Sequence, residues 1–443
     1  MGKIRREMAA GLVAVALMSC GGSSNLRFQG SASCGDTGRA VETWCGDRFC
    51  EFRVVPGGDV FRCEADGMPS CTDASAMAAT ACVEGPRVDA GADDAGGDRD
   101  AGTDSGAPIC EDDERIVARD VDLLLMIDNS ASMMEEQAAF AATLPHLIRA
   151  LQSGDIDEDG TPEFPGAASI QVGVITSDLG TGAASVPTCD AGPRGDDGIL
   201  QTEGCGRTFP DFLLFQDGDP GAFAADVGCL ATTGTDGCGF ERQLDAILKS
   251  VTPSSSATTF DGTSGHADGA NTGFVRRDAL LAIIALTDEE DCSASDTDLY
   301  NASSSVYVGD LNLRCFQFPE AVHPVSRYVN GLIEVKGAAD RVVYAAIAGI
   351  PPGLEGQSWA AILADPDMAE TVDPAMPTRL RPSCSSPRGL AFPPRRFVEL
   401  GRNLDAAGGS ASAHSICNAD LRPAVDGFLT TLGARLQAGV CPR

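Results

Sequence analysis

The sequence predicts an α/β protein with a doubly wound, mostly parallel sheet, preceded by a small disulfide-rich module. Continuous apolar runs occur at 121–127, 279–286 and 342–348, as expected for strands buried on both faces of a parallel sheet. Segments with helical apolar spacing alternate with these runs. Six of the 17 cysteines fall within 34–82, a segment that buries little core and relies on disulfides.

The elements of the larger part follow one another in alternation. We expect strands at 121–127, 170–176, 279–286 and 342–348. We expect helices, with apolar residues every three or four positions, at 133–151, 240–251 and 421–436. Ligands of such sheets bind beyond the carboxyl ends of the strands, so the residues that follow each strand are the candidates for function.

The composition excludes some classes of function. The 443 residues hold 64 Asp and Glu against 32 Lys and Arg, a formal net charge of −32. Binding to nucleic acid needs clustered Lys and Arg, so we expect no nucleic-acid partner. A total of 17 cysteines favours an oxidising compartment.

The first 19 residues have the features of an export signal. Lys3, Arg5 and Arg6 precede a short apolar stretch at 8–18, which ends before Cys20. The stretch 17–20 (LMSC) resembles the bacterial lipobox, in which the cysteine becomes lipid-modified. An ordinary signal peptide that happens to contain Cys20 is the alternative.

The lipobox resemblance implies a lipid-anchored protein of the cell envelope with a tether at 20–33. Lipid on Cys20 leaves an even number of cysteines, and no later apolar run is long enough to span a bilayer, so we expect the lipid to be the only membrane anchor. Gly21, which stands where an acidic residue often marks inner-membrane retention, favours the outer membrane. The periplasmic or surface face stays open.

Two further segments precede the α/β domain, which we place at 110–443. The module at 34–85 contains six cysteines, and the sequence does not choose their pairing. The segment at 86–109 is rich in Asp, Ala and Gly without apolar periodicity, as expected for a solvated linker. The cysteines of the module are Cys34, Cys45, Cys50, Cys63, Cys71 and Cys82.

Oxygen-bearing side chains follow two of the predicted strands. Asp128, Ser130 and Ser132 come after the run at 121–127, and Asp288 with its acidic neighbours follows the run at 279–286. These loops lie side by side if the two strands are neighbours. Carboxylate and hydroxyl ligands suit Mg²⁺, Mn²⁺ or Ca²⁺. N-terminal capping of the following helix by Asp128 and Ser130 is the alternative without metal.

The motif 121–132, VDLLLMIDNSAS, resembles the Asp-x-Ser-x-Ser signature of the von Willebrand factor type A (vWA) family. The stretch 280–288, LLAIIALTD, resembles that family's later strand, which ends in a metal-site Asp. The resemblance covers about 112–441. It implies a Rossmann-like sheet with a metal-ion-dependent adhesion site, in which Asp128, Ser130, Ser132 and Asp288 hold a cation that binds an acidic residue of a partner.

The family's third element is a Thr in the loop before the helix at 240–251. Counting back from Leu244 brings that position nearest Cys238, which cannot ligate a metal if it is in a disulfide. Thr235 is the substitute that we expect, and Thr233 is the weaker candidate.

A second cation site is predicted at 155–163. Asp155, Asp157, Asp159 and Gly160 match the opening Asp-x-Asp-x-Asp-Gly of calcium loops, and Glu163 stands at loop position 9. Gly166 occupies position 12, where an EF-hand has its bidentate Glu. An ordinary acidic turn is the alternative.

Taken together, these features predict an envelope lipoprotein that binds a protein or matrix partner through a divalent cation. A structural envelope protein stabilised by Ca²⁺ is one alternative, and a secreted hydrolase with an unrecognised site is another. We expect no enzyme, since the sequence has no Gly-x-Ser-x-Gly elbow, phosphate loop or dinucleotide fingerprint. Cys292 follows the acidic loop, and a disulfide there would fix the metal-site geometry.

Overall fold

The computed structural model describes residues 118–189 and 192–440, together with the backbone of strands at 27–33, 40–45, 49–55 and 60–64. The chain divides into two units between Thr103 and Asp104. The expected export signal, Cys20 and the whole of the expected linker at 86–109 lie outside the described residues.

The first unit contains an antiparallel sheet of four strands in the order β1-β2-β3-β4. Residues 27–33, which we expected to belong to the tether, form the first of these strands. The strands are β1 (Arg27–Ser33), β2 (Ala40–Cys45), β3 (Phe49–Val55) and β4 (Val60–Glu64).

The second unit is built on a six-stranded sheet in the order β14-β11-β10-β5-β6-β9. Neighbouring strands are parallel throughout, except that β9 at one edge is antiparallel to β6. The predicted α/β class with a mostly parallel sheet is therefore confirmed. The strands are β5 (Asp120–Ile127), β6 (Ser169–Thr176), β9 (Leu213–Phe215), β10 (Leu280–Leu286), β11 (Val342–Ala348) and β14 (Ser410–Ser415).

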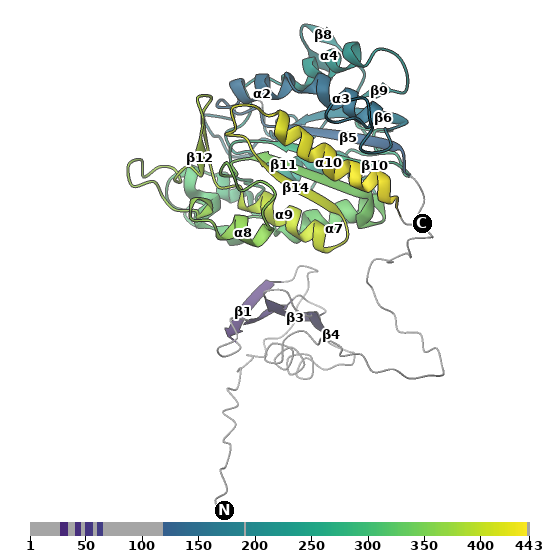
Figure 1. Cartoon of the computed structure of the whole chain (residues 1–443). Helices are drawn as coiled ribbons and strands as arrows, with labels where there is room; N and C mark the ends of the chain where they lie inside the picture. The colour runs from purple at the N-terminus through teal and green to yellow at the C-terminus, as the bar shows by residue number, and fades with distance from the viewer. Residues whose placement is uncertain are drawn as a thin grey trace, which may run out of the picture. The chain divides into compact units, whose positions relative to one another are not determined.

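Helices cover both faces of this sheet (Figure 1). The α-helices are α2 (Met134–Ala141), α3 (Leu144–Ser153), α4 (Pro220–Ala231), α5 (Gln243–Val251), α6 (Arg314–Gln317), α7 (Val325–Lys336), α8 (Trp359–Ala364), α9 (Arg395–Ala406) and α10 (Arg422–Ala438). Short 3₁₀ helices are η3 (Thr297–Tyr300), η4 (Leu311–Leu313), η5 (Pro319–Ala321), η6 (Ala339–Arg341) and η7 (Pro366–Met368). Two small hairpins pair β7 (Glu203–Gly204) with β8 (Arg207–Thr208) and β12 (Cys384–Ser385) with β13 (Leu390–Ala391).

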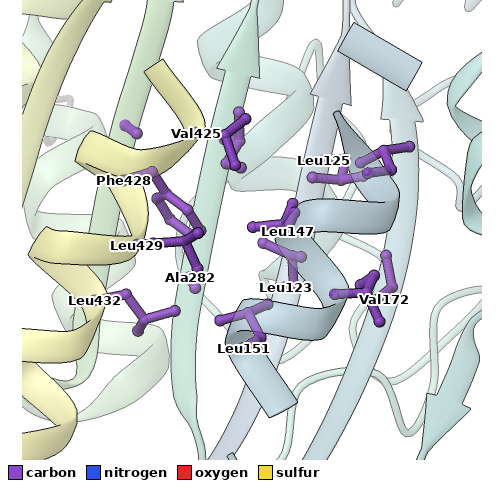
Figure 2. Packing of buried hydrophobic residues seen from close by; sticks show 14 of the residues in the cluster. Leu123, Leu125, Leu147, Leu151, Val172, Ala282, Val425, Phe428, Leu429 and Leu432 are labelled. Carbon is purple, nitrogen blue, oxygen red and sulfur yellow. The ribbon is translucent and has the colours of Figure 1, made fainter. Parts of the chain in front are cut away.

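The alternation of side chains along β5 divides the core into two layers. Leu123 and Leu125 pack with α3 and α10 on one face, as Figure 2 shows. Leu124 and Met126 face the opposite layer, beneath α5, α7 and α9. Because both faces are buried, every residue of the strand is apolar except the acids at its beginning. No helix in the described part of the chain is both long and apolar enough to cross a membrane.

One predicted helix is wrong as a single element. The segment 133–151 forms two helices, because α2 ends at Ala141 and α3 begins at Leu144 with Pro145 in its first turn. A proline has no N–H to donate and its ring clashes with the carbonyl four residues earlier, so it starts a helix better than it continues one. The break leaves Thr143 to donate its hydroxyl to the carbonyl oxygen of Phe140, at 2.7 Å.

Four disulfides join cysteines among the described residues of the second unit. They are Cys189–Cys238, Cys205–Cys229, Cys292–Cys315 and Cys384–Cys417. The bridge expected at Cys292 is thus present. Cys110 and Cys441 lie outside the described residues.

Candidate metal centre

The candidate centre lies where the winding of the sheet reverses. From β5 the chain continues to β6 on one side, and it later returns to β10 on the other side. The last residues of the two neighbouring strands, Ile127 and Leu286, are in register, and the N–H of Asp128 donates to the carbonyl oxygen of Leu286 at 3.0 Å. The loops after β5 and β10 therefore lie side by side, at the place where doubly wound sheets bind ligands.

Asp128 is buried, and hydrogen-bond donors hold both of its carboxylate oxygens. Oδ1 accepts from the backbone N–H of Ser130 at 2.8 Å and from the Ser177 hydroxyl at 3.1 Å. Oδ2 accepts from the Thr287 hydroxyl at 2.6 Å. Burial raises the pKa of Asp128, and these hydrogen bonds lower it in part. The capping bond to Ser130 is compatible with a role in metal binding, because a carboxylate oxygen has more than one lone pair.

A chain of oxygen atoms links the two loops. The hydroxyls of Ser130 and Ser132 lie 3.2 Å apart, and Ser132 donates to Asp288 Oδ1 at 3.2 Å. The backbone carbonyl of Asp288 accepts from the N–H of Phe392 at 2.8 Å, which fixes the acidic loop from its other side. Four of the residues predicted to hold a cation, Asp128, Ser130, Ser132 and Asp288, are thus brought together.

Asp288 lies in an environment that strongly disfavours its charge. Burial, followed by the negative charges of Asp128 and Glu289, raises the pKa of Asp288 to about 8. Burial and the charge of Asp128 likewise raise the pKa of Glu289 to about 7. Carboxylates that repel one another in this way require protons or a cation to share the site.

The loop expected to supply a Thr packs against the Asp128 loop through its backbone. Gln137 Nε2 donates both to the carbonyl oxygen of Asp128 and to that of Gly234, at 2.8 Å in each case. Gly237 N–H donates to the carbonyl oxygen of Asn129 at 2.9 Å. Cys238 is bonded to Cys189 and has no free thiolate to offer.

The two threonines of this loop differ in their surroundings. Within the described residues, no hydrogen bond joins the Thr235 hydroxyl to the side chains of the centre, so its role as a ligand stays a prediction. Thr233 Oγ1 is buried without a hydrogen-bond partner in the described part of the chain.

Glu241 is a residue of the centre that the sequence interpretation missed. Its side chain is 3% exposed, and burial together with the charges of Glu289, Asp128 and Asp288 raises its pKa well above the ordinary value. The sequence placed the start of the helix at 240, whereas α5 begins at Gln243, so Glu241 lies in the preceding loop. The signal in the sequence is an acidic residue shortly before a helix and directly after the Gly-rich stretch 234–239, and this pattern would have identified Glu241.

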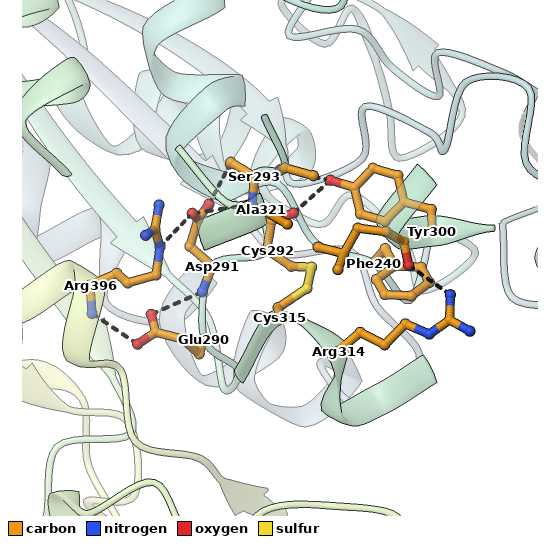
Figure 3. Close-up of a disulfide and its surroundings, with 12 residues drawn as sticks. Phe240, Glu290, Asp291, Cys292, Ser293, Tyr300, Arg314, Cys315, Ala321 and Arg396 are labelled. Carbon is orange, nitrogen blue, oxygen red and sulfur yellow. Dashed lines mark hydrogen bonds and ion pairs between the residues drawn. A yellow bond between two sulfur atoms is a disulfide. The ribbon is translucent and has the colours of Figure 1, made fainter. Parts of the chain in front are cut away.

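The other acids of the loop after β10 have structural partners (Figure 3). Glu290 accepts from the backbone N–H of Arg396 at 2.8 Å and from that of Asp291 at 3.0 Å. Asp291 accepts from Arg396 Nε at 3.0 Å and from the N–H of Leu244 at 2.8 Å. These two carboxylates hold the loop in shape instead of facing the oxygen cluster.

The donor set fits a hard divalent cation. All the side chains that converge here offer oxygen, and the charges with the largest influence on Asp288 are those of carboxylates. A buried oxygen beside the centre also lacks a partner among the described residues: Gln243 donates through Nε2 to the Thr287 hydroxyl at 3.0 Å, and its Oε1 accepts no hydrogen bond. A cation with its bound waters would balance these charges and supply donors to such an oxygen.

The four acids of the predicted calcium loop converge before the amino end of β6, whereas Asp128 and Asp288 follow the carboxyl ends of β5 and β10. One carboxylate oxygen from each of its four acids lies within 4.8 Å of all the others, and Asp155 Oδ1 is buried without a hydrogen-bond partner in the described residues. Gly160, at φ 91°, makes the bend and donates its N–H to Asp155 Oδ2 at 2.8 Å. The acids are Asp155, Asp157, Asp159 and Glu163.

Comparisons with known proteins give little information about the family of this chain. No family model and no curated protein matches the chain. Among solved structures, the proximal thread matrix protein 1 from the mussel byssus matches with a TM-score of 0.25 and 13% identity, over 53% of this chain. The match spans 39% of the length of that protein. The α/β assignment therefore rests on the strand order and directions of this sheet.

Proposed function

We propose that the α/β domain is a binding module that depends on a divalent cation. Asp128, Ser130, Ser132 and Asp288 would hold Mg²⁺, Mn²⁺ or Ca²⁺, with Thr235 as a further ligand of the vWA type. A carboxylate from a partner would complete the coordination shell. The observation that carries this proposal is the continuous oxygen chain from Ser130 through Ser132 to Asp288, beside the buried Asp128.

The surroundings of the centre support a protein or matrix partner. Met134, two residues after Ser132, is 62% exposed although it is a large apolar side chain. Leu390 is also exposed, two residues before the Phe392 whose N–H bonds the Asp288 loop. Exposed apolar side chains around a polar centre are typical of protein-binding surfaces.

The proposed location follows from the sequence of the first 20 residues. Lipid on Cys20 would anchor the protein in the cell envelope, at the outer membrane, without any other contact with the bilayer. The net charge of −32 supports a partner other than nucleic acid. We propose a binding role and not a catalytic one.

A second candidate function is structural stabilisation by Ca²⁺. The convergence of the four acids at 155–163 favours it, because that loop precedes the amino end of β6, whereas the proposed partner-binding residues follow the carboxyl ends of β5 and β10. Ca²⁺ there would stabilise the fold whether or not the first centre binds a partner. The two functions are compatible within one domain.

The deciding experiment is capture of partners from envelope extracts by the full chain, with added cation or with chelator. We expect capture to need the cation and to be lost in Ser130→Ala. Ser250→Ala is the matched control, because Ser250 is also buried but donates to the carbonyl oxygen of Ile247, in α5. Capture that persists in chelator, or that Ser130→Ala leaves unchanged, would contradict the proposal.

A further inference from the structure

A cavity of about 330 Å³ lies between the carboxyl end of α5 and α7. Its walls come from the end of α5, the loop at 253–268, the segment before β10 and one side of α7. Arg277 of this cavity precedes β10, whereas Asp288 of the metal centre follows it, so the two sites lie at opposite ends of that strand. The volume is at the lower end of the range of small-molecule sites, roughly 300–1,000 Å³.

The charged side chains that line the cavity are of both signs. Arg277 is exposed, and its side chain forms no hydrogen bond or ion pair with the residues that the structure describes. Glu334 of α7 is also exposed and accepts from the Ser256 hydroxyl at 3.3 Å. Asp268 accepts from the N–H and the hydroxyl of Ser254, at 2.7 and 2.8 Å. The cavity thus offers one free guanidinium and two carboxylates.

The backbone beside Arg277 is held in place before any ligand binds. Arg276 donates its N–H and its Nε to the two carboxylate oxygens of Asp122, at 2.6 Å in each case, and Asp122 is fully buried in β5. Lys336 Nζ, at the end of α7, donates to the carbonyl oxygen of Arg276 at 2.6 Å. Such preorganisation lowers the entropic cost of binding, because the backbone that carries Arg277 need not be ordered by the ligand.

The other walls of the cavity are largely apolar. Val275 and Val335 are partly exposed, and they line the cavity together with Val251, Pro253 and Ala267. Burying an aliphatic group of a ligand against these side chains is favourable. The cavity therefore combines an apolar surface with separate groups for a negative and a positive charge.

We propose that this cavity binds a free aliphatic α-amino acid of the leucine type. The Arg277 guanidinium would take the carboxylate through two parallel N–H groups, Glu334 and Asp268 would take the ammonium group, and the valines would cover the side chain. The excess of one carboxylate in the cavity disfavours an acidic amino acid, which would bring a second negative charge. The inference does not rest on the proposed function, because it concerns other residues and needs no cation.

The test is titration calorimetry of the full chain with three compounds that share one aliphatic group. L-leucine carries both charges, 4-methylpentanoate carries only the carboxylate, and 3-methylbutylamine carries only the ammonium group. We expect saturable binding of leucine and binding weaker by about tenfold or more for each analogue, because each leaves charges of the cavity unpaired. Equal affinity for leucine and either analogue would overturn the inference.

Variants locate the binding site. Arg277→Gln should weaken leucine binding by about tenfold or more, and Glu334→Gln should weaken it as well. Both positions are exposed, so we expect the variants to fold, and circular dichroism checks this. Arg381→Gln is the matched control, because Arg381 is also exposed without a side-chain partner among the described residues but does not line the cavity. It should leave the affinity within about twofold.

A second control separates this cavity from the metal centre, since the carboxylate of leucine would also suit a bound cation. Ser130→Ala should leave leucine binding unchanged. Leucine binding that is lost in Ser130→Ala and kept in Arg277→Gln would overturn the inference and leave the proposed function intact. Wild type that shows no saturable binding of leucine would overturn the inference too, without bearing on the cation.

Discussion

The Thr287 hydroxyl donates a 2.6 Å hydrogen bond to Asp128 Oδ2 and so joins the ends of β10 and β5. The same hydroxyl accepts from Gln243 Nε2 at 3.0 Å, which adds the first residue of α5 to the connection. Three segments that are far apart in sequence are thereby held around one carboxylate. Together with the donors to Oδ1 from Ser130 and Ser177, this bond fixes the orientation of the carboxylate that we propose as a cation ligand.

We predict that Thr287→Val weakens cation binding about tenfold, because the substitution keeps the shape of the side chain but frees the Asp128 carboxylate to rotate. Calorimetric titration of the metal-free protein measures the change. Thr143→Val is the matched control: it removes a buried hydroxyl that bonds the carbonyl oxygen of Phe140, away from the centre. Equal effects of the two substitutions on affinity would show that Thr287 contributes only to general stability.

The Cys292–Cys315 disulfide should contribute to both stability and cation affinity. It closes a loop with a sequence separation of 23, and Cys292 directly follows the acidic segment of the centre. Replacing both cysteines by serine should lower the free energy of unfolding by about 3 kcal/mol. Cation affinity should fall as well, because Cys292 ends the loop that carries Asp288, and this bridge helps to fix that loop.

The Cys205–Cys229 bridge is the control for this experiment. Its sequence separation is 24, and it joins the β7–β8 hairpin to α4, away from the centre. The double serine variant should lose similar stability in denaturant titration but keep its cation affinity. A loss of affinity in both variants would mean that general loosening, and not the position of Cys292, is responsible.

The sequence was sufficient to predict the centre of the sheet and part of the site, for identifiable reasons. The strands ending at Ile127 and Leu286 are buried on both faces, so they appear as continuous apolar runs, and their polar successors stand out. By contrast, β14 has the sequence SASAHS and lies at the sheet edge, where burial is incomplete and apolar residues are not required. This strand forms because it pairs with β11, and no local pattern of apolar residues predicts that pairing.

The sequence did not predict Glu241 as a residue of the centre, because its place in the preceding loop depends on where α5 begins. Apolar periodicity extends to Phe240, but Phe240 packs with Tyr300 and Cys292 in a separate cluster, and the helix starts only at Gln243. That cluster is organised by a disulfide whose pairing the sequence left open. Helix and strand boundaries that are set by tertiary contacts of this kind are the features that are hardest to predict from a sequence.

In metal-free protein, Asp288 should make stability fall as the pH rises. Its pKa of about 8 in the folded protein exceeds the ordinary 3.8, so the folded state holds a proton that the unfolded chain has released. The favourable contribution is complete below pH 3.8 and is lost as the pH rises through about 8.

We therefore predict that Asp288→Asn is more stable than wild type by about 2 kcal/mol at pH 8.5 in chelator, and that the difference shrinks toward pH 5. Urea denaturation at the two pH values measures it. Adding Ca²⁺ should stabilise wild type more than the variant, which keeps only the predicted site at 155–163. Asp217→Asn, at an exposed position, should show no such pH dependence. A variant less stable than wild type at pH 8.5 in chelator would contradict the assigned electrostatics.

The loop at 155–163 should bind a cation independently of the Asp128 centre. It connects α3 to β6, and it reaches α10 because the carbonyl oxygen of Glu163 accepts from Gln437 Nε2 at 3.1 Å. Within it, Glu158 is not one of the four converging acids, and its Oε1 lies 3.1 Å from His146 Nδ1. Ca²⁺ that draws the acids together would hold α3 and α10 in their packed arrangement.

We predict that Asp157→Asn combined with Asp159→Asn removes one of two bound Ca²⁺ ions and abolishes the stabilisation that this ion provides. At a free Ca²⁺ concentration of about 100 times Kd, that stabilisation is about 2.7 kcal/mol. Calorimetric stoichiometry and thermal unfolding with and without Ca²⁺ measure the two effects. Ser130→Ala should remove the other ion and leave this one, since the two sites lie at opposite ends of the parallel strands and share no ligand. An unchanged stoichiometry in the double Asn variant would mean that the converging carboxylates at 155–163 form only an acidic turn.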